Sequence, residues 1–137
     1  MGQFYAYYVL TGMTLLLSWG IACILYGLPS RGQPDSIKKF CREMTLYWGV
    51  INTIIGIFAV MTVLAKFDSY NTDLSVQQHA LRVFRFNVGL DLIYSVVGLV
   101  IAYAGQHISA KRRGYGLAIL VQGGFLFVID GVLSVML

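Results

Sequence analysis

The sequence is poor in charged residues, and acidic residues are the scarcest of these. Only 12% of its 137 residues are charged, six of them acidic, whereas 58% are hydrophobic. Ordinary globular domains have about 25% charged residues, so this composition excludes a typical soluble domain and predicts an integral membrane protein. The formal charge of +4 could suggest nucleic acid. However, the basic residues flank apolar runs, as expected for membrane topology, and we predict no nucleic-acid partner.

Cysteine and histidine, which build many covalent and metal sites, are also scarce. The two cysteines, Cys23 and Cys41, offer no disulfide framework. His79 has no second ligand three or four residues further along a helix, so we predict no metal site. The sequence contains no Ser-His-Asp set, no CxxC motif and no glycine-rich phosphate loop. We therefore predict no cofactor and no enzymatic activity.

Long apolar runs dominate the sequence. A helix needs about 20 apolar residues to cross the hydrocarbon core of a bilayer. Four segments meet this requirement, at about residues 4–26, 44–65, 86–104 and 114–136. The predicted fold is an all-α polytopic membrane protein, in which residues 1–137 form one antiparallel bundle of four transmembrane helices in the lipid bilayer.

The segments between these runs contain turn and capping signals. Two prolines and a glycine predict a loop at Leu28–Pro34, and Asp35 or Ser36 is expected to cap the next helix. The polar stretch Lys66–Asp73 predicts an exposed loop. Asp73 is expected to cap a helix that begins at Leu74 and continues into the third span.

The distribution of basic residues predicts an orientation in the membrane. With four spans, both termini share a face with segment 66–85, which contains Lys66, Arg82 and Arg85. Seven basic residues lie on the other face: Arg31, Lys38, Lys39, Arg42, Lys111, Arg112 and Arg113. Because basic residues gather on the cytoplasmic side, loops 28–43 and 105–113 are predicted to be cytoplasmic and the termini outside. All but the first of these seven are predicted to contact lipid headgroups.

Two acidic residues lie within the predicted spans. A charge at bilayer depth costs at least about 2.5 kcal/mol, so each needs a partner, a proton or water. Asp91 lies about five residues into the third span and Asp130 about seven residues before the C-terminus, which places both roughly 8–11 Å below the outer face. The two carboxyl groups are therefore expected at similar heights on adjacent antiparallel helices, where they can meet. Neighbouring carboxylates resist double ionisation, so at least one is expected to hold its proton more tightly than usual.

Other polar residues are expected to join this pair. Asn87 and Tyr94 lie four and three residues from Asp91, on the same helical face. The predicted buried polar cluster consists of Asn52, Asn87, Asp91, Tyr94, Gln122 and Asp130. Asn52 is expected to link helices through its amide. Arg82 or Arg85 is expected to reach the carboxyl groups from above, as a pairing or gating residue.

Several of these residues also support a family resemblance. The stretch Asn87-Val88-Gly89-Leu90-Asp91 with Tyr94, then Arg113-Gly114-Tyr115-Gly116 and Val121-Gln122-Gly123-Gly124-Phe125 before Asp130, with Trp48 and Asn52, resembles an uncharacterised family of small four-helix bacterial membrane proteins. The resemblance implies a protein of the bacterial cytoplasmic (inner) membrane. It implies no activity, since the family has no established one.

Three classes of function agree with these features. The first is a non-enzymatic bundle that acts as a subunit, an assembly partner or a module for an apolar ligand, in a homo-oligomer or a larger membrane complex. The alternative is a small transporter or channel coupled to protons or cations, because an intramembrane Asp pair suits that role. It would work as an oligomer, since one copy of four helices rarely encloses a path. A lipid-modifying enzyme is the third, with weaker support because a carboxyl pair alone provides no positioned substrate site.

Overall fold

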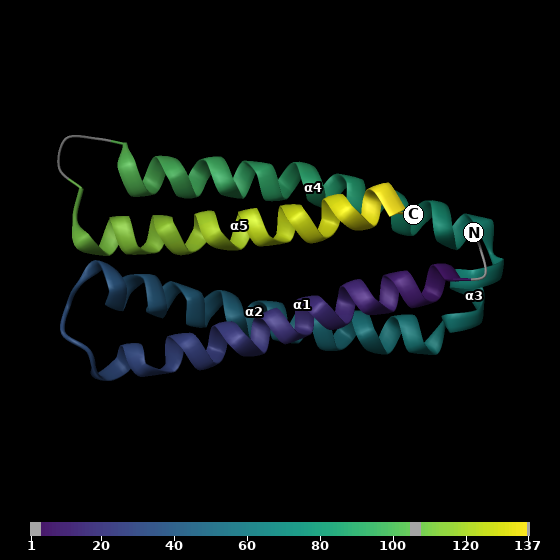
Figure 1. Ribbon diagram of the computed structural model, residues 1–137, viewed down its shortest axis with the longest axis horizontal. Helices are drawn as coiled ribbons and strands as arrows, with labels where there is room; N and C mark the ends of the chain where they lie inside the picture. Colours follow the sequence, from purple (N-terminus) through teal and green to yellow (C-terminus); the bar gives the residue numbers. More distant parts are fainter. Residues whose placement is uncertain (1–3, 105–107, 137) are drawn as a thin grey trace.

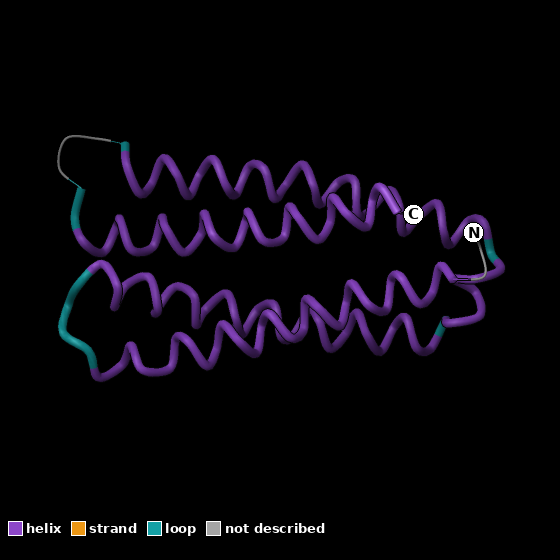
Figure 2. Tube along the Cα trace, viewed as in Figure 1, coloured by secondary structure: helices purple, strands orange, loops and turns teal. Residues whose placement is uncertain are grey.

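The computed structural model describes residues 4–104 and 108–136, and its described residues are almost entirely helical (Figures 1 and 2). The elements are α1 (Tyr5–Gly27), the 3-10 helix η2 (Leu28–Gly32), α2 (Ile37–Ala65), α3 (Phe67–Thr72), α4 (Leu74–Tyr103) and α5 (Ala110–Met136). The described residues contain no strand. The predicted all-α, four-helix architecture is confirmed.

Four helical segments are long and apolar enough to cross a membrane, namely α1 with η2, α2, α4 and α5. These segments contain the four predicted spans and extend beyond them, most of all in α4, which begins at Leu74. Its first three turns carry the polar residues that precede the apolar run. Helical structure therefore continues past the apolar part of the sequence, as expected when capping and packing, not hydrophobicity, decide where a helix ends.

The helices form two hairpins, α1–α2 and α4–α5, joined by packing of α2 against α5 (Figure 1). The described parts of both termini lie at the end that carries α3, here called the α3 end. η2, the end of α4 and the start of α5 lie at the opposite end, here called the η2 end. Within the described residues, α4 packs along α5 and has no extended packing against α1 or α2. One side of α4 is consequently open to the surroundings.

Close approach of helices depends on glycine. A Cβ atom at Gly49 of α2 would lie 2.8 Å from the backbone nitrogen of Ile24 and 2.9 Å from the Cβ of Cys23. Any larger residue would push α1 away from α2. Small residues at such contacts are the usual means by which membrane helices bring their backbones together.

The expected helix caps are present. The Ser36 hydroxyl accepts a hydrogen bond from the Lys39 N–H at 3.1 Å, so Ser36 rather than Asp35 caps α2. Asp73 caps α4 by accepting from the Ser75 N–H at 2.9 Å and from its hydroxyl at 2.7 Å. These bonds favour the charged carboxylate and hold the pKa of Asp73 below its usual value.

Both predicted loops contain helix. Leu28–Gly32 forms η2, where Pro29 occupies the first turn and so lacks only an N–H that would have no intrahelical partner. The prediction of an exposed loop at Lys66–Asp73 is wrong over Phe67–Thr72, which forms α3. The connection from Ala104 to Ser109, within the predicted cytoplasmic loop 105–113, includes residues 105–107, which lie outside the described residues.

α3 is helical because it packs onto the start of α1. The Asn71 side-chain oxygen accepts from the Ala6 N–H at 2.8 Å, which satisfies one of the free donors at the beginning of α1. The rings of Tyr7 and Phe67 meet edge to face at 5.0 Å between centroids. A polar segment thus forms a half-buried cover whose partner lies 60 residues earlier, a relation that local composition does not reveal.

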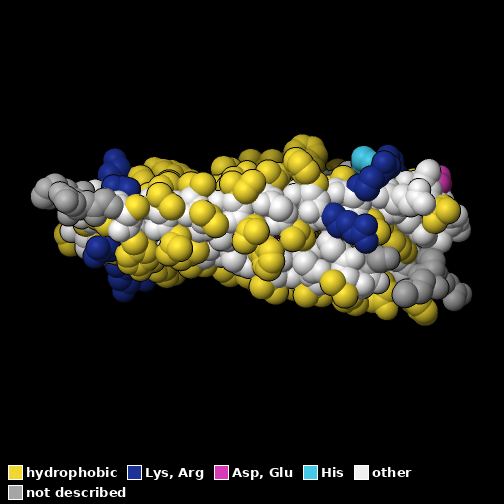
Figure 3. Space-filling view, turned by 90° about the horizontal axis from the view of Figure 1, so that it is seen from above, with side chains coloured by type: hydrophobic (Ala, Val, Ile, Leu, Met, Phe, Trp, Pro, Cys, Tyr) yellow, Lys and Arg dark blue, Asp and Glu magenta, His cyan; other side chains and the backbone are white. Residues whose placement is uncertain are grey.

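Side chains of α1, α2, α4 and α5 meet in one apolar core at the α3 end. Its buried members are Tyr5, Val9, Val63, Ala80, Phe84 and Leu133. Most other large apolar side chains are exposed, and they cover the length of the molecule between basic groups at its two ends (Figure 3). An apolar belt between charged ends is typical of a protein that spans a bilayer.

Candidate functional site

The carboxyl groups of Asp91 in α4 and Asp130 in α5 lie together inside the bundle. Only 3% of Asp91 and 8% of Asp130 is exposed, and each carboxyl is the other's side-chain hydrogen-bonding partner. A hydrogen bond between two carboxyl groups requires one proton, since ionised carboxylates only accept. The equal depths predicted for these residues are thus realised as a direct contact, here called the carboxyl pair.

The carboxyl pair is incompletely satisfied. The Oδ2 atom of Asp91 is buried and has no hydrogen-bond partner among the described residues. The nearest hydroxyls on the same helices are engaged elsewhere, because Ser95 donates to the backbone carbonyl of Asp91 at 2.9 Å and Ser134 to that of Asp130 at 2.7 Å. An acceptor without a donor at this depth is costly, which makes it the strongest indication of a ligand or proton site in the molecule.

The pair lines a cavity of about 500 Å³ bounded by α1, α2, α4 and α5. We call this the α2–α4 cavity. Among its lining residues, Ile55, Val83 and Tyr94 are exposed at the surface, so the cavity opens between α2 and α4, whose backbones make few close contacts. In a bilayer this opening faces lipid. Ligand sites typically have volumes of about 300–1,000 Å³ and are largely apolar with a few polar groups, as this one is.

Gln122 and Asn52 form a second polar cluster instead of joining the carboxyl pair. The Gln122 Oε1 atom accepts from Trp19 Nε1 at 2.8 Å and from Asn52 Nδ2 at 3.1 Å, while its Nε2 atom contacts Cys23 Sγ at 3.3 Å. We call these four residues the amide cluster. The prediction of a single polar cluster is therefore wrong. Eight residues separate Gln122 from Asp130, about 12 Å along α5, which is too far for one network.

Asn87 and Tyr94 line the α2–α4 cavity beside Asp91 but are not buried with it. Asn87 is half-buried and Tyr94 is 38% exposed. The Tyr94 ring packs against Trp48 of α2, with 5.8 Å between centroids. Among the described contacts neither side chain hydrogen bonds to the carboxyl pair, so their predicted burial is corrected to a position at the edge of the site.

Arg82 and Arg85 are exposed and do not line the cavity. Both ion pairs in the described part of the chain involve Lys39, so neither arginine pairs with a carboxylate there. Their side chains point away because the cavity-facing positions on this part of α4 are Ala80, Val83 and Phe84. The predicted pairing of an arginine with the carboxyl groups is absent from the structure.

Comparison with protein families identifies the group to which the sequence belongs. A family model matches residues 7–131, which include every residue of the carboxyl pair and the amide cluster. The chain belongs to DUF6992, a family of unknown function. The predicted membership of an uncharacterised family is confirmed. Comparisons with curated proteins and with solved structures found no match.

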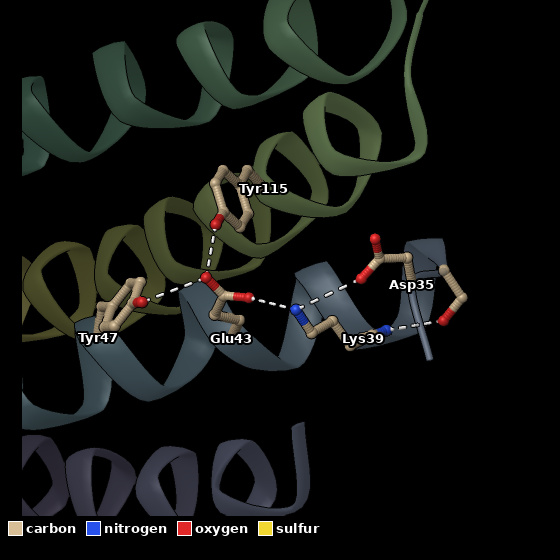
Figure 4. A network of polar contacts seen from close by, with 6 residues as sticks. Asp35, Lys39, Glu43, Tyr47 and Tyr115 are labelled. Carbon is tan, nitrogen blue, oxygen red and sulfur yellow. Dashed lines mark hydrogen bonds and ion pairs between the residues drawn. The ribbon is translucent and has the colours of Figure 1, made fainter. Parts of the chain in front are cut away.

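At the η2 end of this DUF6992 chain, a polar network links α2 to α5 (Figure 4). Glu43 accepts from the Tyr115 hydroxyl at 2.7 Å and from the Tyr47 hydroxyl at 3.2 Å, and pairs with Lys39 at 3.1 Å. Glu43 was not among the predicted site residues. The spacing of Lys39, Glu43 and Tyr47 places all three on one helical face. The contact with Tyr115 of α5 could not be predicted from the sequence near Glu43.

The other basic residues predicted at lipid headgroups also lie at the η2 end. Arg42, Lys111 and Arg113 lie over the rings of Tyr26, Tyr115 and Tyr103 at 4.8, 5.6 and 5.7 Å respectively. Arg112 donates to the carbonyl of Val100 at 3.4 Å, and Lys38 is exposed. These contacts hold positive charges in a ring around one end of the bundle.

A smaller cavity of about 350 Å³ lies on the other side of the amide cluster, toward the η2 end. Gln122, Trp19 and Cys23 line it together with Tyr26 and Cys41. The Asn52–Gln122 hydrogen bond joins a residue that lines the first cavity to one that lines the second. In the described ranges, no group of three or more His, Cys, Asp or Glu side chains converges in either cavity.

Proposed function

We propose that this DUF6992 protein is a non-enzymatic, multi-pass membrane protein that binds an apolar molecule in the α2–α4 cavity. The observation that carries this proposal is a mostly apolar space of about 500 Å³, open at the side of the bundle, with an unpartnered buried carboxylate oxygen in its wall. A lateral opening suits a ligand that is dissolved in the bilayer, because such a molecule can enter without crossing water.

The proposal includes a location and an orientation. We place the protein in the bacterial cytoplasmic membrane with both termini outside, because seven basic residues at the η2 end oppose three toward the α3 end. Lys38, Lys39, Arg42, Lys111, Arg112 and Arg113 then lie at the cytoplasmic headgroups. A maleimide that cannot cross membranes should label Asp68→Cys but not Ser109→Cys in intact cells, in a background carrying Cys23→Ala and Cys41→Ala. The reverse labelling pattern would contradict the orientation.

The proposal includes assembly with other chains. α4 packs mainly on α5 and leaves an apolar face uncovered along its length. Such a face agrees with a homo-oligomer or a larger membrane complex, in which another helix or lipid covers it. Native mass spectrometry from detergent would measure the number of chains in the assembly. A strict monomer would contradict the homo-oligomer.

Proton- or cation-coupled transport by an oligomer is the second candidate. The specific observation in its favour is that two cavities lie on either side of the Asn52–Gln122 hydrogen bond, with the carboxyl pair in the wall of one. Loss of that bond would connect them. Proteoliposomes with an imposed pH gradient should then show a flux that Asp91→Asn and Asp130→Asn abolish. A flux equal to that of empty liposomes would rule this candidate out.

Direct binding tests the first candidate. Radiolabelled dodecanol should bind saturably to protein in lipid nanodiscs, with empty nanodiscs as the measure of simple partition. Ala59→Trp should abolish the saturable part, because Ala59 lines the cavity and an indole would fill it. Val135→Trp is the matched control, since that residue is 88% exposed at the end of α5. Absence of saturable binding in the unsubstituted protein would reject the proposal.

A further inference from the structure

The charge balance of the α2–α4 cavity narrows the class of its ligand. A hydrogen bond between the two carboxyl groups needs a proton, and with one shared proton the pair carries one negative charge. No Lys or Arg is among the described residues that line the cavity. The histidine in its wall, His79, lies twelve residues from Asp91, about 18 Å along α4. The described residues that line the cavity therefore place no Lys or Arg beside this charge.

The carboxyl pair lacks a hydrogen-bond donor for one of its oxygens. Asp91 is among the residues that line the cavity, yet only 3% of it is exposed. Its Oδ2 atom is buried and has no hydrogen-bond partner among the described residues. An ammonium group has three donors and a full positive charge, so it would satisfy this oxygen and neutralise the pair at once. A neutral hydroxyl would satisfy the oxygen but leave the charge.

Two aromatic rings beside the pair favour the same chemistry. Trp48 and Tyr94 pack edge to face at 5.8 Å and line the same end of the cavity as Asp91. Faces of tryptophan and tyrosine attract cations, and the attraction grows when water is excluded. Carboxylate oxygens with aromatic rings form a site that suits an amine better than an alcohol or an acid.

The rest of the cavity is suited to a hydrocarbon chain. From the carboxyl pair toward the α3 end, its wall consists mainly of apolar side chains from four helices, among them Val9, Met13, Ile55, Val63, Phe84 and Ile129. From Tyr94 to His79 the lining of α4 extends over about 22 Å. A long apolar groove with one charged end matches a molecule with one chain and one charged head.

We propose that the α2–α4 cavity binds a single-chain amphiphilic amine, with its ammonium group at the Asp91–Asp130 pair and its chain along the apolar wall. This inference rests on the proposed function, because it assumes that the cavity is a ligand site. The molecule enters from the bilayer between α2 and α4, head group first, and the complex is electrically neutral.

The test compares matched probes in nanodiscs of neutral lipid. Unlabelled dodecylamine, dodecanol and dodecanoate compete against radiolabelled dodecylamine, and empty nanodiscs report partition. We expect dodecylamine to compete about tenfold or more better than dodecanol, since hydrogen bonds to charged groups are the stronger class, and dodecanoate to compete least. Asp91→Asn should remove the preference, so that dodecylamine and dodecanol compete equally. Its amide can still donate to Asp130, so the fold is expected to persist.

The controls separate the ways in which the inference can fail. Asp68→Asn removes an exposed carboxylate of α3 that lies outside the cavity, and it should leave the preference intact. Equal competition by the amine and the alcohol, with saturation retained, would overturn the amine class while the proposed function stands. No saturable binding of any probe would overturn both. Displacement of dodecylamine by ammonium chloride but not by sodium chloride, at concentrations equal to the probe's, would assign the site to a small cation and overturn the amphiphile.

Discussion

The carboxyl pair and the amide cluster are both polar and both buried among the same helices, yet they differ in whether donors match acceptors. In the amide cluster, one oxygen of Gln122 accepts from Trp19 and Asn52, and its nitrogen contacts Cys23. In the carboxyl pair, the only described partner of each group is the other, and one oxygen has none. A satisfied network holds helices together, whereas an unsatisfied one is costly unless something else completes it. Burial alone therefore does not distinguish a structural cluster from a binding site.

The largest expected effect concerns the amide cluster. Gln122→Ala would leave the half-buried donor of Trp19 and the buried donor of Asn52 without an acceptor, and should lower the free energy of unfolding by about 2–4 kcal/mol. The measurement is equilibrium unfolding in mixed detergent micelles, followed by circular dichroism. Ser18→Ala is the control, because its hydroxyl donates only to the Thr14 carbonyl of its own helix. A loss no larger than that of the control would mean that the amide cluster is not what holds the hairpins together.

The opposite sign is expected for the carboxyl pair. Replacing both residues, Asp91→Leu with Asp130→Leu, removes a desolvated charge and the unpartnered oxygen, and should leave stability unchanged or raise it by about 0–3 kcal/mol. The same unfolding assay measures it, and the binding of dodecylamine should be lost in parallel. The unfolding free energy of the conservative single variant Asp91→Asn is measured for comparison with the double variant. If the double variant were destabilised as strongly as Gln122→Ala, the two clusters would both be structural and the comparison would fail.

Gly123 connects the position of α4 to the carboxyl pair. A Cβ atom there would lie 2.6 Å from the Ser95 hydroxyl and 2.9 Å from the Asp91 carbonyl, so Gly123→Ala must push α4 away from α5 at the site. We expect a loss of about 1–2 kcal/mol in unfolding free energy and weaker binding of dodecylamine.

The next residue along the chain provides the control for this prediction. A Cβ atom at Gly124 meets nothing within 4 Å. Gly124→Ala should therefore gain a few tenths of a kcal/mol or more from its helix propensity. Equal effects of the two substitutions would show that contact between α4 and α5 does not position the pair.

These expectations define what the sequence could and could not predict. Apolar length predicted the four helices, and depth counted along two spans placed Asp91 and Asp130 at similar heights, because both quantities depend on residues close in the sequence. The assignment of Gln122 and Asn52 to the wrong cluster has the opposite cause. Their partners, Trp19 and Cys23, lie on α1 about 100 positions from Gln122. The sequence around an indole or a thiol in an apolar helix does not indicate which distant residue it will contact.

The same reason explains the error at residues 67–72. Composition there indicates a polar loop, but Asn71 is bound to the first turn of α1 and Tyr70 packs against the apolar core. Both contacts join α3 to residues that are distant in the sequence and lie beside it only in the folded bundle. The cavity could not be predicted from the sequence either, because it results from the wide spacing of the α2 and α4 backbones in the described residues. No sequence pattern indicates how far apart two helices lie.

The smallest effect is expected at the α3 end, away from both clusters. Hydrogen bonds from Ser75 lower the pKa of Asp73 below its usual 3.8, so the charged cap stabilises α4 above that value and the contribution is lost as pH falls through the folded pKa. Asp73→Ala should therefore reduce the melting temperature slightly near neutral pH, and its difference from the unsubstituted protein should shrink as the pH falls below about 3.8. Asp73→Asn, which keeps an acceptor oxygen, should retain much of the stability at neutral pH. Because Asp73 is fully exposed, a loss as large as that of Gln122→Ala would mean that the start of α4 controls the whole bundle, and that the clusters are secondary to it.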